Sequence, residues 1–206
     1  MIAYIYLGCV ITSAILGGIL GTIKFNIIIK PEMKKRLSND ISVTEMRLLE
    51  MKIANVKKQY RLSDEASLDE IATALKIQDA GIDSTIDERA IIIKNGDIFN
   101  VYHSKYVPQC DWKFDFAHEC GHIINGSKLP ANRPTGHNKE YEEQLADYTA
   151  SAILMPFNKV KTQLEKSDFS SISGFGKLRA LNRFCREYGV SQIVVLRRIN
   201  EIRMLS

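Results

Sequence analysis

The chain opens on an unbroken apolar segment. Residues 2–23 contain no Asp, Glu, Lys or Arg, and a helix of that length extends about 33 Å, close to the thickness of the hydrocarbon core of a bilayer. The first basic residue is Lys24, so the segment lacks the positively charged start of a cleaved signal peptide. The pattern predicts an uncleaved transmembrane helix over residues 1–24.

Further along, the apolar positions follow a helical period. Met46, Leu49, Ile53 and Val56 lie three or four residues apart, which predicts an amphipathic helix over residues 44–60. Capping residues, glycines and prolines bound the other helices that we expect. These cover residues 67–76, 112–124, 140–155, 178–188 and 191–204.

Two short runs predict strands instead. Residues 90–94 and 98–102 are rich in β-branched and aromatic side chains, and Asn95-Gly96-Asp97 joins them. Asn-Gly tolerates the positive φ angles of a tight turn, so the runs predict a β-hairpin. An extended peptide could pair with the edge of the second run. Helices with one small antiparallel sheet give an α+β fold.

The net charge of +4 is concentrated near the apolar segment. Residues 24–61 contain ten Lys or Arg and four Asp or Glu, whereas residues 62–206 contain eighteen and twenty. Basic residues that follow an apolar segment are typical of a membrane surface, and the positive-inside rule then places the body of the chain in the cytoplasm. The near-neutral body does not favour a nucleic-acid partner, so we interpret the arginine-bearing last two helices as a packing cap.

These patterns divide the chain into four expected parts. Gly17 and Gly21 in the first part fit a small-residue contact between transmembrane helices, which would give a homodimer in the lipid bilayer. The parts are a transmembrane anchor (1–24), a basic juxtamembrane linker (25–43), the main domain (44–160) and a C-terminal helical extension (161–206).

The sequence His118-Glu119-Cys120-Gly121-His122 lies within the helix expected over residues 112–124. Two histidines four residues apart lie on one face of a helix, so both imidazoles can bind one Zn²⁺ at roughly 2.0–2.1 Å. Glu119 lies beside that face and can reach a water molecule on the metal, which is the position of a general base. The motif therefore predicts a catalytic zinc site.

A catalytic zinc needs a third protein ligand and leaves its fourth position open. Glu140, Glu142 and Glu143 are the candidates on the next helix. We choose Glu143 because Asp147 lies four residues on, where its carboxylate can accept the free N–H of a ligating histidine. For Glu140 and Glu142 the alternative is an acidic helix start that interacts favourably with the helix dipole.

Three stretches that carry this motif, residues 114–122, 143–150 and 154–156, resemble the ImmA/IrrE metallo-endopeptidases. The resemblance covers about residues 67–156 and implies a zincin-like core of minimal gluzincin-like design. Cys120 stands where the family usually has an apolar residue, and Tyr148 stands where it usually has Phe. An N-terminal membrane anchor is not part of the shared core.

By motif position, the resemblance makes His118, His122 and Glu143 the ligands of one Zn²⁺ and Glu119 the base. Many members of the family cut or regulate helix-turn-helix repressors. We therefore expect a membrane-anchored cytoplasmic zinc endopeptidase with a protein substrate, which the resemblance suggests is such a repressor. The alternative is a non-proteolytic zinc-binding regulator that acts by binding a partner.

Peptide hydrolysis through a tetrahedral oxyanion also needs a hydrogen-bond donor. The sequence offers four candidates without placing any of them: His103, His137, Tyr141 and Tyr148.

Overall fold

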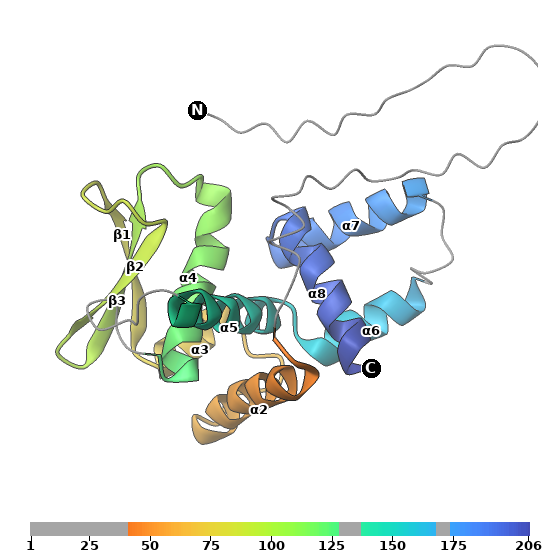
Figure 1. Cartoon of the computed structure of the whole chain (residues 1–206), viewed down its shortest axis with the longest axis horizontal. Coiled ribbons are helices and arrows are strands. Elements are labelled where there is room, and N and C mark those ends of the chain that lie inside the picture. The colour runs from red at the N-terminus through yellow and green to blue at the C-terminus, as the bar shows by residue number, and fades with distance from the viewer. Residues whose placement is uncertain (1–40, 128–136, 168–173) are drawn as a thin grey trace, which may run out of the picture.

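The computed structural model describes residues 41–127, 137–167 and 174–206. Over these residues the fold is α+β, as predicted, with seven helices and one three-stranded sheet. The sheet lies on one side of the molecule, and the last three helices lie on the other (Figure 1). Two helices between them, α4 (Gln109–Asn125) and α5 (His137–Leu154), carry the predicted metal ligands.

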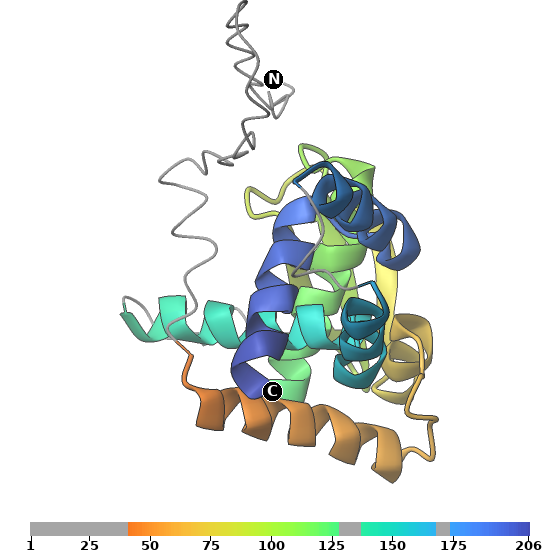
Figure 2. The same ribbon diagram turned by 90° about the vertical axis from the view of Figure 1, so that its right-hand side faces the viewer.

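The first two described helices, α2 (Val43–Gln59) and α3 (Leu68–Ala74), begin at capping boxes. Ser67 accepts the backbone N–H of Glu70, and the Glu70 carboxylate accepts the backbone N–H of Ser67, which satisfies two otherwise unpaired donors of the first turn. Ser42 caps α2 in the same way. The apolar stripe of α2 is buried as the spacing predicted, and α2 packs against α4, α5 and α8 along one side of the molecule (Figure 2).

The sheet contains the predicted hairpin and one strand that the sequence analysis missed. β2 (Ala90–Asn95) and β3 (Ile98–Ser104) pair antiparallel across the predicted turn, where Gly96 has a φ of 59°. β1 (Ile77–Asp83) pairs with β3 in parallel, so the sheet is mixed and the prediction of an antiparallel sheet was wrong. Gly81 lies inside β1, where the register shifts and its φ is 86°.

The strand order is β1-β3-β2, so β3 is the central strand. Both of its edges are already hydrogen-bonded to neighbouring strands. The prediction that residues 98–102 pair with an extended peptide was therefore wrong, because a paired edge has no free ladder of N–H and C=O groups. Within the described residues, the free edges of this sheet belong to β1 and β2.

The start of α4 also differs from the prediction. The helix begins at Gln109, directly after Pro108, and not at Trp112 behind a capping Asp111. The Asp111 carboxylate accepts a hydrogen bond from Arg89, which also donates to Asp115, so these contacts hold the start of β2 on α4. The far end of α4 closes at Gly126, whose φ of 75° is the left-handed conformation typical of a helix end.

Three helices follow α5. Pro156 ends α5 as predicted, but it also precedes a helix that the sequence analysis missed. Proline is tolerated at the start of a helix because the N–H that it lacks would have no partner within the helix there. The last two helices were predicted, and Gly189 between them has a positive φ. The three are α6 (Phe157–Lys166), α7 (Gly174–Tyr188) and α8 (Gln192–Leu205).

The predicted membrane localisation is contradicted. In the part of the chain that the structure describes, no helix combines the length and the apolarity needed to cross a bilayer. The longest of these helices, α5, carries five charged side chains between Lys139 and Asp147, which hydrocarbon would penalise. The apolar segment 2–23 on which the prediction rested lies outside the described residues, as does the proposed Gly17/Gly21 contact.

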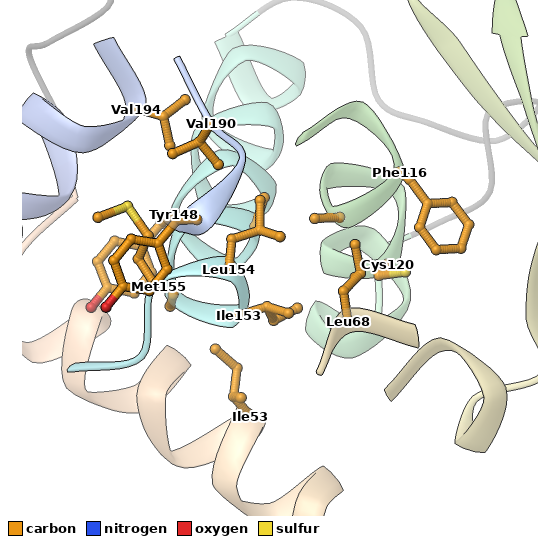
Figure 3. Close-up of a cluster of buried hydrophobic side chains, with 14 of the residues drawn as sticks. Ile53, Leu68, Phe116, Cys120, Tyr148, Ile153, Leu154, Met155, Val190 and Val194 are labelled. Carbon is orange, nitrogen blue, oxygen red and sulfur yellow. The ribbon is translucent and has the colours of Figure 1, made fainter. Parts of the chain in front are cut away.

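The hydrophobic core lies between α2, α3, α4 and α5 and continues to α8. Figure 3 shows Ile53, Leu68, Cys120 and Ile153 gathered there from four different helices. Cys120 has no solvent exposure, and burial raises the pKa of its thiol. This cysteine therefore fills the core as a small apolar group.

Candidate metal centre

The metal centre depends on a close approach of α4 to α5. Gly121 faces Ala146 so closely that a Cβ atom at Gly121 would lie 2.8 Å from the Ala146 carbonyl oxygen and 3.3 Å from Cβ of Thr149. Ala146 and Ala150 are both completely buried. Small residues on both helices thus place the histidines of α4 beside the acidic face of α5.

Replacing Gly121 by Ala should destabilise the protein. At an unconstrained helical position this change stabilises by up to about 1 kcal/mol, but here the new methyl group meets backbone atoms that cannot rotate away. We expect a net loss of about 1–3 kcal/mol in the free energy of unfolding, measured by urea denaturation of the full chain. An unchanged or higher midpoint at the same slope would contradict the close approach.

The structure brings together the three side chains predicted to bind metal. Nε2 of His118 lies 3.1 Å from Nε2 of His122 and 3.1 Å from Oε2 of Glu143. The other oxygen of Glu143 lies 3.6 Å from Nε2 of His122. One ligand atom from each residue can be chosen so that all three lie within 4.8 Å of one another.

These distances fit one zinc ion. Two ligand atoms bound to Zn²⁺ at tetrahedral angles lie about 3.3 Å apart, which falls between the observed separations of 3.1 and 3.6 Å. Two imidazoles and one carboxylate are also a ligand set that catalytic zinc uses, and it leaves a fourth position for water or substrate. The chemistry and the spacing of these residues therefore fit a single Zn²⁺.

Asp147 orients the first histidine. Its Oδ1 lies 2.8 Å from Nδ1 of His118, so it accepts the Nδ1 proton and leaves Nε2 directed toward Glu143 and His122. This is the carboxylate–histidine pairing typical of zinc sites. Asp147 thus occupies the supporting position that the four-residue spacing from Glu143 predicted.

The charges in this cluster favour a cation. Burial opposes protonation of His118, but its hydrogen bonds to Asp147 and Glu143 outweigh burial and raise its pKa to about 10. Burial likewise raises the pKa of Glu143, yet its contacts with His118 and His122 hold that pKa well below its usual range. Zinc binds the neutral imidazole, so its binding at Nε2 of His118 would release any proton held there.

Glu119 lies next to His118 on α4 and is almost completely buried, with 3% of its surface exposed. A buried carboxylate beside a cation site is typical of a catalytic base. The role of Glu119 as the base stays a prediction.

Three of the four candidate oxyanion donors have other partners within the described part of the fold. The Tyr148 hydroxyl donates to Glu50 of α2 over 2.9 Å, and Figure 3 shows Tyr148 on the side of α5 away from α4. The Tyr141 hydroxyl donates to Glu45 of α2. His103 is fully buried on β3, where its ring stacks on Trp112 at 4.9 Å.

The two tyrosine hydroxyls donate to carboxylates of α2, and the His103 ring stacks on Trp112, so these contacts hold the three groups away from the role of oxyanion donor. His137 is the first residue of α5, and its side chain lies outside the described part of the structure.

The sequence analysis missed one residue that contacts the cluster. Nη1 of Arg197 donates to Oδ2 of Asp147 over 2.7 Å. Arg197 lies on α8, 50 positions beyond Asp147, in a helix that we interpreted as a packing cap. Nothing local in the sequence singles it out among the arginines of the last two helices.

Comparison with known proteins agrees with this geometry. Residues 101–200 match the model of a peptidase family described as the IrrE N-terminal-like domain. Residues 101–200, just under half of the chain, are thus similar to the IrrE N-terminal-like domain. The match confirms the resemblance and supports a peptidase-like hydrolase at the level of the family, whose members typically depend on zinc. It includes β3 from residue 101 onward, both ligand-bearing helices, α6, α7 and α8 as far as residue 200.

Solved structures resemble the IrrE-like fold as well. A Mycobacterium tuberculosis transcriptional regulator aligns with a TM-score of 0.50 at 15% sequence identity, over 82% of this chain and 50% of the regulator. The chain thus spans about half the length of that protein, and the similarity is one of fold. No curated protein matches the sequence.

Proposed function

We propose that this IrrE-like chain is a zinc-dependent endopeptidase that hydrolyses a peptide bond in a protein substrate. The observation that carries the proposal is the convergence of His118, His122 and Glu143 at separations that fit one tetrahedral zinc. Glu119, buried next to His118 on α4, favours hydrolysis over a purely structural zinc site. A structural zinc has four protein ligands and needs no general base, whereas a catalytic zinc leaves its fourth position open for water or substrate.

The residues of the chain divide the chemistry among them. A zinc ion held by the three ligands would polarise a peptide carbonyl and acidify a water molecule. Glu119 would accept the proton of the attacking water and donate it to the leaving amine. Asp147 would keep His118 in the orientation that directs Nε2 toward the other ligands.

For the substrate we propose a helix-turn-helix transcriptional repressor. The support is the resemblance of residues 114–122, 143–150 and 154–156 to metallo-endopeptidases, many of which act on such proteins. A non-proteolytic regulator with the same zinc site remains the competing function, and the experiments below separate the two.

Replacing Glu143 by Ala tests the zinc site. Loss of a direct ligand should weaken Zn²⁺ binding by at least roughly a hundredfold, since removal of an outer partner alone costs 10–100-fold. The measurement is zinc content and affinity of the full chain, with cleavage of a proteome-derived peptide library followed by mass spectrometry. We expect one tightly bound zinc and cleavage in the wild type, and neither in the variant.

Glu140→Ala is the matched control, because Glu140 belongs to the same acidic turn of α5 but not to the cluster. It should bind zinc like the wild type. Equal zinc affinity in all three proteins would refute the proposed site, whereas zinc binding without any cleavage would favour the regulator.

A further inference from the structure

A continuous chain of contacts joins the C-terminal helix to the metal centre. Nη1 of Arg197 on α8 lies 2.7 Å from Oδ2 of Asp147 on α5, and Oδ1 of the same carboxylate lies 2.8 Å from Nδ1 of His118 on α4. Each oxygen of Asp147 thus has its own partner. Arg197 is 13% exposed and Asp147 30%, so the pair is sheltered enough to be stronger than a surface ion pair.

The position of Arg197 is itself held in place by its neighbour. Arg198 is fully buried, and its Nε donates to the carbonyl of Met155 over 2.9 Å. Its Nη2 donates to Glu50 of α2 over 2.7 Å. These contacts fasten α8 to the end of α5 and to α2, so Arg197 meets Asp147 from a rigid helix and not from a mobile tail.

The geometry requires such an anchor. An aspartate that accepts one hydrogen bond through Oδ1 can still turn about its Cβ–Cγ bond, because that torsion is broad. A second hydrogen bond at Oδ2 removes this freedom. The imidazole of His118 then keeps the orientation in which Nε2 lies 3.1 Å from both Nε2 of His122 and Oε2 of Glu143.

We propose that Arg197 is a positioning residue of the metal centre, which acts through Asp147 to hold His118 ready for zinc. The functional centre therefore extends beyond the His-Glu motif and its glutamate ligand to the last helix. This inference rests on the proposed zinc site, and it assigns a role to α8 other than packing.

The test is the zinc affinity of the full chain, measured by competition with a chromophoric chelator. Arg197→Met keeps the apolar stem and removes the donors, and we expect it to weaken zinc binding about tenfold. Arg197→Lys keeps the charge and one donor and should recover most of the affinity. Arg186→Met, which removes an exposed arginine from α7, should bind zinc like the wild type.

A double-mutant cycle separates positioning from general stability. Asp147→Asn should weaken zinc binding 10–100-fold, and adding Arg197→Met should cause no further loss, because Arg197 acts through Asp147. Additive losses, or full affinity in Arg197→Met, would overturn the inference. Should Arg197→Met fail to fold, Arg197→Gln takes its place in the same cycle.

A spectroscopic readout makes the result independent of activity. Co²⁺ bound to Arg197→Met should show d–d bands shifted from those of the wild type, while Arg186→Met should show none of this shift. Unchanged bands would overturn the inference while leaving the zinc site intact. A wild-type chain that binds neither zinc nor cobalt would instead refute the proposed function, and the role of Arg197 with it.

Discussion

Glu119→Gln is expected to abolish peptide hydrolysis while leaving zinc binding intact. Glutamine has nearly the same shape as glutamate and suits the same buried position on α4, but its amide cannot accept the proton of the attacking water. Loss of a general base lowers the rate on the order of 10²–10⁴-fold. The measurement is kcat/KM on a peptide that the wild type cleaves, together with the zinc content of the same preparation.

The comparison decides between the two candidate functions. A variant that keeps zinc, loses cleavage and also loses its biological effect would establish proteolysis as the function. If Glu119→Gln keeps the biological effect but does not cleave, the protein acts as a non-proteolytic regulator. Glu140→Gln on the acidic turn of α5 is the control and should retain full activity. Wild-type kcat/KM in Glu119→Gln would show that another group is the base.

Arg198→Ala is expected to cause the largest loss of stability. The guanidinium has no solvent exposure and bonds Glu50, Glu201 and the carbonyl of Met155. Burial raises the pKa of Glu201 even though Arg198 opposes the shift. Removal of one member of a buried ion-pair network leaves its partners unpaired and costs about 3–5 kcal/mol, here measured by urea unfolding of the full chain.

Replacement of both buried partners provides the control for this experiment. Arg198→Met combined with Glu201→Leu removes the two charges together, and it should be clearly more stable than Arg198→Ala because no buried carboxylate is stranded. Arg179→Ala, on the exposed face of α7, should change the free energy of unfolding by less than about 0.5 kcal/mol. A comparably small loss for Arg198→Ala would contradict the buried network.

Several features of the fold could be predicted because they depend on neighbouring residues. The capping box at Ser67, the turn at Gly96 and the helical stripe of α2 each involve groups within a few positions of one another. The missed elements are of two kinds. Among the described residues β1 pairs with β3, about twenty positions away, and Pro156 ends one helix and starts another.

The candidate site divides in the same way. Its donor atoms were predictable where helix geometry alone places them: His118 and His122 one turn apart, and Glu143 one turn before Asp147. The positions of the oxyanion candidates could not be predicted, because Tyr141 and Tyr148 donate to carboxylates of α2, which lie nearly a hundred positions earlier. A buried polar group forms a hydrogen bond with whichever partner the packing brings near, and sequence spacing does not predict a partner that lies far away in the chain.

The sequence by itself determined the candidate ligand set, since the identity and spacing of two histidines and two carboxylates are local properties of two helices. Only the tertiary structure decided how close the two helices lie and which distant residue contacts Asp147. Gly121 against Ala146 sets how close the two helices come, and Arg197 reaches Asp147 from the last helix. Both contacts follow from how distant segments pack together, which is a property of the whole chain.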